Sequence, residues 1–144
     1  MTVLTKDTAV DRLMHIPQEE LAEDVIGDNI GFVYIITNLS NNKKYIGKKL
    51  FKFSKTKKVK GKKKKTKVES NWKSYFGSNE ELLEDVKVLG EDNFKREILH
   101  LCKSKGTANY LEMKEQILHN ALESDCYYNQ WIMCKVHRSH IKIA

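Results

Sequence analysis

The chain has 144 residues, of which 40% are hydrophobic, and this size predicts one domain with a modest core. No run approaches the roughly 18 apolar residues that a membrane span requires, and the acidic N-terminus has no signal-peptide character, so we expect a soluble, cytoplasmic protein without a membrane partner. The three cysteines are odd in number and lack C-x-x-C spacing, which argues against a zinc site and favours free thiols in a reducing compartment.

The formal net charge is +7, and the charges are unevenly distributed along the chain. Residues 1–28 carry seven acids, whereas residues 29–68 carry fourteen lysines and no acid. Such a block is typical of a surface that binds a polyanion, with DNA or RNA as the leading candidates. The alternative is a solvated lysine loop without a binding function.

The acidic residues 1–29 are interpreted as a helical N-terminal extension. A short helix is expected over residues 8–14. A second helix should begin at Pro17 and stop at Gly27, because proline suits a first helical turn, acids follow it, and glycine ends helices. We expect this extension either to pack on the sheet of the domain that follows, residues 30–132, or to cover its basic surface.

Residues 31–49, GFVYIITNLSNNKKYIGKK, predict a β-hairpin. The β-formers Phe32 to Ile36 precede a turn rich in asparagine, and a second strand resumes at Lys44. This pairing places Tyr34 and Tyr45 on neighbouring strands. Judged by pattern alone, the two tyrosines are ordinary half-buried aromatic residues of a strand pair.

Residues 51–69 are predicted to form an exposed basic insertion, a hairpin or loop with Gly61 at its tip. Lysines that meet phosphates release counterions, so binding through this segment should depend steeply on salt and carry little sequence specificity. A small basic tail, residues 133–144, follows the domain. The predicted DNA-binding residues are Lys58, Lys60, Lys62, Lys63, Lys64, Lys65, Lys67, Lys73 and, in the tail, Arg138.

Two helices are expected directly after the insertion. The first has Ser70 as its N-cap and aromatic residues at helical spacing. The second has Ser78 as its N-cap, with Glu81 completing a capping box, and it ends at Gly90. The buried stripe of the second helix is predicted to contain Leu82, Leu83, Val86 and Leu89.

A strand over residues 94–101 and a helix from Thr107 to about Leu122 complete the predicted elements. Together the elements predict an α/β (α+β) fold, a small three-stranded, mainly antiparallel sheet flanked by helices. The strand should turn Phe94, Ile98 and Leu99 toward the core. The apolar side of the last helix is predicted to consist of Tyr110, Leu111, Met113, Ile117, Leu118 and Leu122.

Five short segments occur in the order found in the GIY-YIG nucleases. Residues 32–34, F-V-Y, stand for G-I-Y, and residues 45–47 are an intact Y-I-G. Residues 75–78, Y-F-G-S, residues 108–112, A-N-Y-L-E, and residues 128–129, Y-N, follow. The ordered set covers well over half of the chain and resembles the GIY-YIG family, closest to its phage homing-endonuclease-like members.

This resemblance implies a metal-dependent DNA endonuclease that hydrolyses phosphodiester bonds by water attack. It implies that Tyr45 is the base or orients the water, with Lys48 as its electrostatic partner. Tyr34 and Tyr75 would lie around the phosphate, and Asn129 would support the site. A phenol accepts a proton only if nearby cations lower its pKa of about 10, and Lys48 is close enough in sequence to do so.

The resemblance also implies that Glu112 is the metal ligand, for one Mg²⁺ (or Mn²⁺) per active site, a hard cation that needs few protein ligands. Glu115 lies about one helical turn further on nearly the same face and is the rival ligand. Without the motif, both glutamates are ordinary solvated helix residues. The five histidines form no H-x-x-x-H pair, so we expect no histidine metal site.

One departure from the family concerns its phosphate-binding arginine, which precedes a histidine or tyrosine by about one helical turn. Tyr75 fits the second position, but the first is Asn71. Lys67 or Lys73 are candidates to replace the arginine, without its bidentate fork, and Arg138 is another. The missing arginine favours an alternative, a non-catalytic nucleic-acid-binding module on the same fold.

Double-stranded DNA is the expected partner. An RNA-directed nuclease or binding protein remains the third alternative, because a lysine loop does not distinguish the two sugars. A domain of this size cuts two strands only as a homodimer or by turning over twice. Target sequence and biological role are not predicted by these patterns.

Overall fold

The structure, a computed structural model, describes residues 16–132 and 137–141, apart from the side chains of Lys57 and Val59. The predicted helix over residues 8–14 lies outside the described residues. The elements are β1 (Ile16–Pro17), η1 (Gln18–Glu20), α2 (Glu23–Ile26), β2 (Gly31–Asn38), β3 (Lys44–Leu50), β4 (Lys52–Val59), β5 (Lys62–Glu69), η2 (Trp72–Ser74), α3 (Glu80–Leu89), η3 (Glu91–Asn93), β6 (Phe94–Cys102), α4 (Lys105–Leu118) and η4 (Arg138–Ile141).

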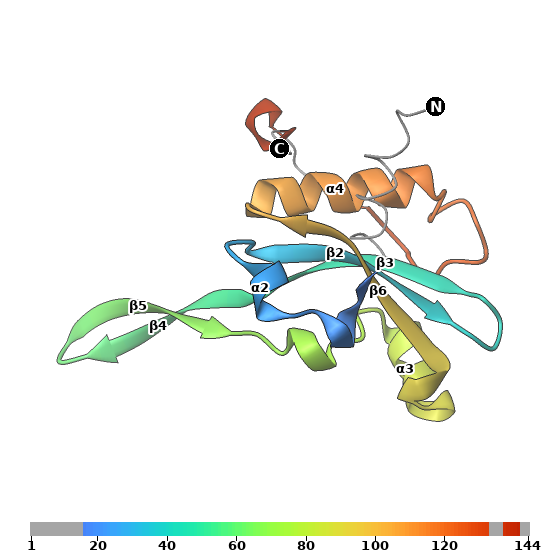
Figure 1. Cartoon of the computed structure of the whole chain (residues 1–144), viewed down its shortest axis with the longest axis horizontal. Helices are drawn as coiled ribbons and strands as arrows, with labels where there is room; N and C mark the ends of the chain where they lie inside the picture. Colours follow the sequence, from blue (N-terminus) through green and yellow to red (C-terminus); the bar gives the residue numbers. More distant parts are fainter. Residues whose placement is uncertain (1–15, 133–136, 142–144) are drawn as a thin grey trace.

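The main sheet has the order β1-β6-β2-β3, and each neighbouring pair is antiparallel. The helix α4 covers one face of this sheet, and α3 lies on the other side (Figure 1). This arrangement confirms the predicted α+β class and the antiparallel pairing. It corrects the predicted number of strands from three to four, because the short strand β1 adds to the edge of β6.

The central strand β2 is buried along its whole length between β3 and β6, as its run of β-formers predicts. Successive side chains alternate between two core clusters. Phe32, Tyr34 and Ile36 belong to the cluster on the α3 side. Val33 and Ile35 belong to the cluster that includes residues of α4. The predicted hairpin of β2 and β3 is confirmed.

The segment that begins at Pro17 does not form the single predicted helix. Ile16 pairs with Ile98 of β6, so Pro17 lies in a strand, and the helical residues are limited to η1 and the four-residue α2. Gln18 is fully buried and donates from Nε2 to the carbonyl of Trp72, which anchors this stretch to the domain. Pairing with a strand at least 80 residues away overrides the local helical pattern.

The helix starts also differ by a few residues from the prediction. The predicted Ser70 helix is the single turn η2, because the Ser70 hydroxyl instead donates to the carbonyl of Leu50 at 2.6 Å. The N-cap of α3 is Asn79 rather than Ser78, and its side chain accepts from the Leu82 amide at 2.9 Å. The predicted end of α3 at Gly90 is confirmed.

The helix α4 begins at the N-cap Ser104, earlier than the predicted Thr107, and its last residue is Leu118. Its sheet-facing residues include Ala108 and Leu111, both buried. The predicted burial is wrong for part of the apolar side of this helix, because several of its residues are exposed to solvent. The exposed members are Ile117, Leu118 and Leu122, and in α3 the same holds for Leu83 and Leu89.

The predicted basic hairpin is confirmed as β4 and β5, which form a sheet of their own and project away from the main sheet (Figure 1). The strands are joined by Lys60 and Gly61, with φ of +51° and +78°. Positive φ at both positions is the pattern of a type I′ hairpin turn, and glycine adopts it without steric cost at Gly61. The described side chains of β5 are all exposed.

Two further expectations concern membranes and thiols. Among the described residues, no helix is long and apolar enough to cross a membrane. Cys102 and Cys126 are free thiols, and burial raises the pKa of Cys102 to about 12. The third cysteine, Cys134, lies outside the described residues.

Candidate active site

A cleft of about 600 Å³ lies between β3, α3, α4 and the segment after Tyr127. Three of the predicted catalytic residues, Tyr45, Glu112 and Asn129, line it together. They come from β3, from α4 and from an irregular segment near the C-terminus. Folding therefore brings three distant parts of the sequence to one concave surface. The full lining is Tyr45, Ser78, Asn79, Glu80, Glu81, Glu112, Gln116, Asn129, Gln130 and Trp131.

Three tyrosine rings meet beside the cleft. The Tyr34 ring centroid is 6.2 Å from that of Tyr45 and 6.1 Å from that of Tyr75, the latter at an interplanar angle of 90°. Tyr34 pairs with Gly47 across the hairpin, and a Cβ at Gly47 would collide with the Tyr34 hydroxyl. Glycine at this position therefore gives the Tyr34 side chain its space. Burial raises the pKa of Tyr34 well above its usual range, and the neighbouring Tyr45 adds to the effect.

The Tyr45 hydroxyl lies 3.4 Å from the Ser78 hydroxyl at the rim of the cleft. Burial raises the pKa of Tyr45, the Ser78 hydrogen bond opposes this, and the negative charge of Glu112 raises the pKa further. The expected lowering by Lys48 is therefore not found. The Lys48 ammonium donates to the Asn109 side chain and lies 4.0 Å from Glu112 instead.

The two glutamates of α4 differ in their surroundings. Glu112 lines the cleft and its side chain is 19% exposed; burial raises its pKa, and Lys48 partly offsets the rise. Glu115 lies 2.8 Å from His100 and 3.3 Å from His119, and the His100 hydrogen bond lowers the pKa of Glu115. Glu115 already has two partners and is absent from the cleft lining, so Glu112 is the carboxylate open to a ligand.

The chemistry of the cleft fits a hard divalent cation with few protein ligands. Within the described residues, no three His, Cys, Asp or Glu side chains are grouped as a metal site. The mostly buried Glu112 carboxylate, whose pKa is raised, gains from a nearby positive charge. Mg²⁺ is commonly held by one or two carboxylates, with water and substrate phosphate completing its shell. Glu112 therefore fits such an ion, and a closed protein cage is not needed.

Asn129 fixes the backbone of β3 next to Tyr45. Its side-chain oxygen accepts from the Ile46 amide at 3.0 Å, and its Nδ2 donates to the Ile46 carbonyl at 2.8 Å. Gln116 of α4 donates to the same carbonyl at 3.0 Å. Asn129 is 6% exposed, so these hydrogen bonds are shielded from water. They hold the strand that carries Tyr45 against the helix that carries Glu112.

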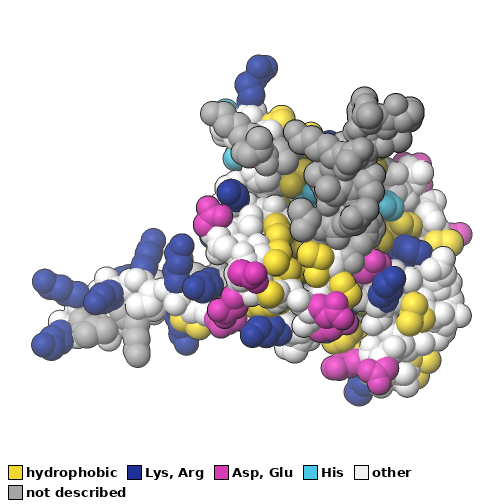
Figure 2. All heavy atoms as spheres, in the orientation of Figure 1, with side chains coloured by type: hydrophobic (Ala, Val, Ile, Leu, Met, Phe, Trp, Pro, Cys, Tyr) yellow, Lys and Arg dark blue, Asp and Glu magenta, His cyan; other side chains and the backbone are white. Residues whose placement is uncertain are grey.

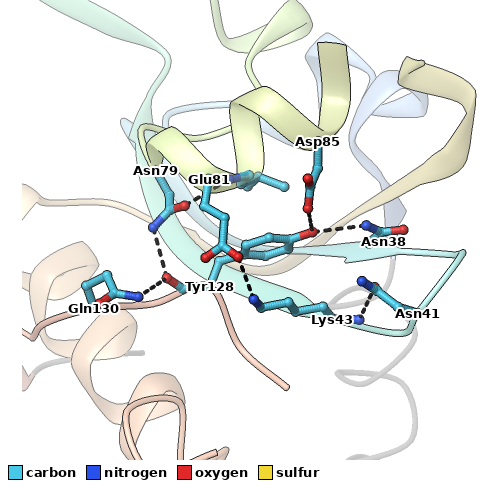
Figure 3. Close-up of polar contacts among 9 residues, drawn as sticks. Asn38, Asn41, Lys43, Asn79, Glu81, Asp85, Tyr128 and Gln130 are labelled. Atoms are coloured by element: carbon cyan, nitrogen blue, oxygen red, sulfur yellow. Dashed lines mark hydrogen bonds and ion pairs between the residues drawn. The ribbon is translucent and has the colours of Figure 1, made fainter. Parts of the chain in front are cut away.

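Tyr128 anchors the segment that carries Asn129 (Figure 3). Its hydroxyl donates to Asp85 of α3 at 2.6 Å and accepts from Asn38 of β2 at 3.0 Å. Its carbonyl accepts from Asn79 at 2.9 Å. The ring is fully buried in the cluster on the α3 side. Asn129 is thereby positioned by both α3 and the main sheet.

Comparison with known proteins decides the family. The family model described as "Putative endonuclease segE, GIY-YIG domain" matches residues 15–132. The chain belongs to the GIY-YIG family. It is also 34% identical over 98 residues to a protein of Enterobacteria phage T4 described as "Putative endonuclease segE". This match covers 68% of the chain and 39% of the phage protein, so the chain spans well under half of that relative. No solved structure matches significantly.

The GIY-YIG domain of this chain has Asn71 where the family arginine is expected, and Asn71 is exposed at the start of η2. The partly buried Arg96 has a structural role, since its Nη1 donates to the carbonyls of Lys73 and Tyr75, each at 3.1 Å. The cation next to Tyr75 is Lys49, whose Nζ lies 4.0 Å from the ring centroid. Burial lowers the pKa of Lys49.

The candidates for replacing the arginine lie elsewhere. Lys67 is in the projecting hairpin, the Lys73 ammonium lies 5.5 Å from the Trp72 ring centroid, and Arg138 is in η4. None of the three is among the residues that line the cleft. Position in the sequence did not predict which cation approaches Tyr75, because the approach of Lys49 depends on a tertiary contact between β3 and the residue that follows η2.

Several residues near the site were not predicted as site residues, among them Ser78, Asn109, Gln116 and Lys49. Two of them carried a usable signal, because Asn109 lies within the A-N-Y-L-E segment and Ser78 within Y-F-G-S. Gln116 lies one helical turn after Glu112, so its face could have been inferred from helical spacing. Lys49 had no distinguishing signal among fourteen lysines in the basic block.

Proposed function

We propose that this chain is a metal-dependent DNA endonuclease that hydrolyses phosphodiester bonds by water attack at phosphorus. The observation that carries the proposal is the meeting of the Tyr45 hydroxyl and the Glu112 carboxylate in one cleft. The family supports the reaction class, since this is a GIY-YIG endonuclease domain. A hydroxyl that contacts water and a carboxylate that holds a cation are complementary requirements of phosphodiester hydrolysis.

Tyr45 is the group at the attacking water. Its raised pKa keeps it a neutral phenol at pH 7, able to donate to and accept from a water molecule. The charge of Glu112 is one cause of that raised pKa, so neutralising the carboxylate would lower the pKa of Tyr45 and make its phenolate, the form that accepts a proton, easier to form. Glu112 would hold one Mg²⁺ or Mn²⁺ per active site, and such an ion would supply the positive charge that phosphodiester hydrolysis needs on the phosphate oxygens.

The phosphate itself is received by cations and hydroxyls around Tyr45. Lys48 is beside Glu112, and Lys49 lies over the Tyr75 ring, so two ammonium groups flank the tyrosines. We assign Lys49 the place of the missing arginine, as a point charge without the bidentate fork. Tyr34 and Tyr75 support this arrangement through ring packing, and Tyr34 is too buried to be the proton acceptor.

The proposed partner is double-stranded DNA, bound in part by the lysines of the hairpin and by Lys73 and Arg138. Residues 30–132 are proposed as the nuclease domain, with residues 51–69 as its basic insertion and residues 133–144 as a basic tail. The N-terminal extension contributes β1 to the sheet. Cleavage of both strands by one such domain requires a second copy or a second turnover.

The test is cleavage of supercoiled plasmid with Mg²⁺ or Mn²⁺, against the same reaction in EDTA. Glu112→Ala and Tyr45→Phe should each reduce the rate at saturating DNA by at least about 100-fold while binding persists. Tyr110→Phe, on the same helix as Glu112, is the matched control and should cut normally. Nicking that survives in EDTA or in both variants would overturn the assignment.

A second candidate function is favoured by Asn71. Without the family arginine, the chain would be a nucleic-acid-binding module in which the tyrosines only pack. A protein that shifts DNA in gels yet cuts with none of several divalent cations would establish this alternative. Competition between DNA and RNA duplexes in the same binding assay tests the RNA-directed alternative.

A further inference from the structure

The hairpin of β4 and β5 projects as an isolated ribbon with basic side chains along it (Figure 2). Its strands have eight residues each and pair only with each other. At about 3.3 Å per residue this gives a ribbon roughly 26 Å long. Every described side chain from Lys52 to Val68 is exposed, so the ribbon buries no core of its own.

The register shows which lysines share a face. Lys58 pairs with Lys63, and side chains alternate along each strand, so lysines emerge on both faces of the ribbon. One face also carries the exposed pair Phe53 and Val68. We call the face that carries Phe53 and Val68 the mixed face and the opposite face the polar face. The polar face has Lys52, Lys58, Lys63, Lys65 and Lys67, and the mixed face has Lys55, Lys62 and Lys64.

Few groups within the ribbon offset the positive charge of its lysines. Like charges directly opposite each other, such as Lys58 and Lys63, destabilise a strand pair, and an isolated two-stranded hairpin is marginal in water. Its one acid, Glu69, accepts from the Trp72 indole at 3.2 Å at the base. Among the described side chains, no lysine of the ribbon forms an ion pair. An external polyanion on both faces would remove this repulsion.

Resting on the proposed nuclease function, we propose that the ribbon enters the major groove of B-form DNA, with each face directed at one phosphate backbone. The major groove is about 12 Å wide and admits a two-stranded β-ribbon, whereas the minor groove is about 6 Å wide. A ribbon lying against a single backbone would use the lysines of one face only. Lysines on both faces match a channel with a phosphate wall on each side.

The ribbon contacts DNA on one side of the cut. It continues directly from β3, the strand that carries Tyr45, and projects away from the sheet (Figure 1). From Tyr45 to the tip at Lys60, an extended chain at about 3.3 Å per residue spans at most about 50 Å, on the order of one and a half turns of the double helix. The ribbon therefore holds the duplex within roughly one and a half turns of the scissile phosphate.

The first experiment compares the two faces. One variant carries Lys55→Gln, Lys62→Gln and Lys64→Gln, and the other carries Lys58→Gln, Lys63→Gln and Lys65→Gln. Binding to a 30-base-pair duplex is measured in EDTA over a range of salt. Each variant should reduce the slope of log affinity against log salt by about 2 to 3, because three phosphate contacts are lost. If only one of the two variants lowers the slope, the ribbon does not lie between two phosphate backbones and the proposal is overturned.

A matched control carries Lys87→Gln, Lys95→Gln and Lys114→Gln, three exposed lysines of the globular body. It loses the same net charge and should keep the wild-type slope. If this control lowers the slope as much as the ribbon variants do, the effect reflects net charge and the proposal fails. Because binding is measured without divalent metal, the result does not depend on whether the chain cuts DNA.

The second experiment identifies the groove. Methyl green occupies the major groove and netropsin the minor groove of an A·T-rich duplex, and each is used as a competitor. Methyl green should lower wild-type affinity and have less effect on the two ribbon variants, while netropsin should not distinguish them. If netropsin instead lowers wild-type affinity and has less effect on the two ribbon variants, while methyl green does not distinguish them, the proposal is overturned. Double-stranded RNA has a deep, narrow major groove, so equal losses of RNA and DNA binding in the ribbon variants would overturn it as well.

Discussion

The cleft and the basic hairpin are built in opposite ways. The cleft joins Tyr45, Glu112 and Asn129 from distant segments, and buried hydrogen bonds fix their relative positions. The hairpin is a local structure whose strands pair only with each other and whose described side chains are exposed. Under the proposed function, cleavage in the cleft requires a fixed geometry. DNA binding by the hairpin requires a sufficient number of positive charges and their placement on both faces.

This difference determines how each region should respond to substitution. Changes in the cleft should alter the free energy of unfolding and the rate of cleavage together, because the same contacts hold the core and the site. Changes in the hairpin should alter affinity and its salt dependence, with folding unaffected. The following predictions test this contrast.

The largest effect on folding should come from Asn129→Ala. It removes both hydrogen bonds to the Ile46 backbone and leaves the buried amide without its partner, at a cost of about 2–4 kcal/mol. Urea unfolding measures this, and cleavage at saturating DNA should fall as β3 loosens. Gln130→Ala is the control and should change stability by less than about 0.5 kcal/mol, since Gln130 is exposed. A similar small effect for Asn129→Ala would show that the cleft is not held in this way.

Gly47→Ala should lower the free energy of unfolding by about 1–3 kcal/mol, because the added methyl group collides with the Tyr34 hydroxyl. Its counterpart in the hairpin is Gly61→Asn, where nothing lies within 4 Å of an added Cβ and asparagine tolerates the positive φ of +78°. Thermal unfolding should show a loss for the first variant and almost none for the second. Equal losses would remove the contrast between the two regions.

The charged forms of Glu112 and Glu115, the two glutamates of α4, should change the free energy of unfolding in opposite directions. The lowered pKa of Glu115 stabilises the fold at neutral pH, and this contribution is lost as the pH falls through its folded pKa, below the usual 4.5. The raised pKa of Glu112 means that its charged form destabilises the fold at neutral pH. At pH 7, Glu115→Gln should therefore destabilise by about 1 kcal/mol, and Glu112→Gln should stabilise by about 0.5 kcal/mol.

Urea unfolding between pH 3 and pH 7 measures both variants. Both differences from wild type should shrink toward low pH, where the native carboxylates are protonated. Glu112→Gln should also lose cleavage while it gains stability, as expected when an active-site charge is kept in an unfavourable place. Destabilisation by Glu112→Gln at pH 7 would show that its contact with Lys48 outweighs the effect of burial.

The smallest effect on folding should come from Lys63→Gln in the hairpin. The free energy of unfolding should stay within about 0.5 kcal/mol of wild type, and the salt slope of DNA binding should fall by about 0.9. Lys48→Gln is the comparison in the cleft and should lower the cleavage rate at saturating DNA. A slower rate for Lys63→Gln at saturating DNA would mean that the hairpin also takes part in positioning the scissile phosphate.

Local sequence patterns predicted the elements whose conformation is determined by residues close together in the chain. The run Phe32 to Ile36 specified the central strand, and the lysine block with Gly61 specified an exposed hairpin with its tip. The helix that starts at Pro17 was predicted wrongly, because a partner strand decides the conformation there. The exposed side of α4 was also missed, since Ile117 has the periodicity of a buried residue but α4 packs through another face.

The sequence by itself determined the family, through five ordered segments, and the position of its lysines predicted a surface that binds a polyanion. Only the tertiary structure decided which groups meet. It separated Glu112 from Glu115 and brought Lys49 to the Tyr75 ring. The physical reason is that composition and spacing act along the chain, whereas a pKa, a cleft and a charge pair depend on burial and on contacts between segments far apart in sequence.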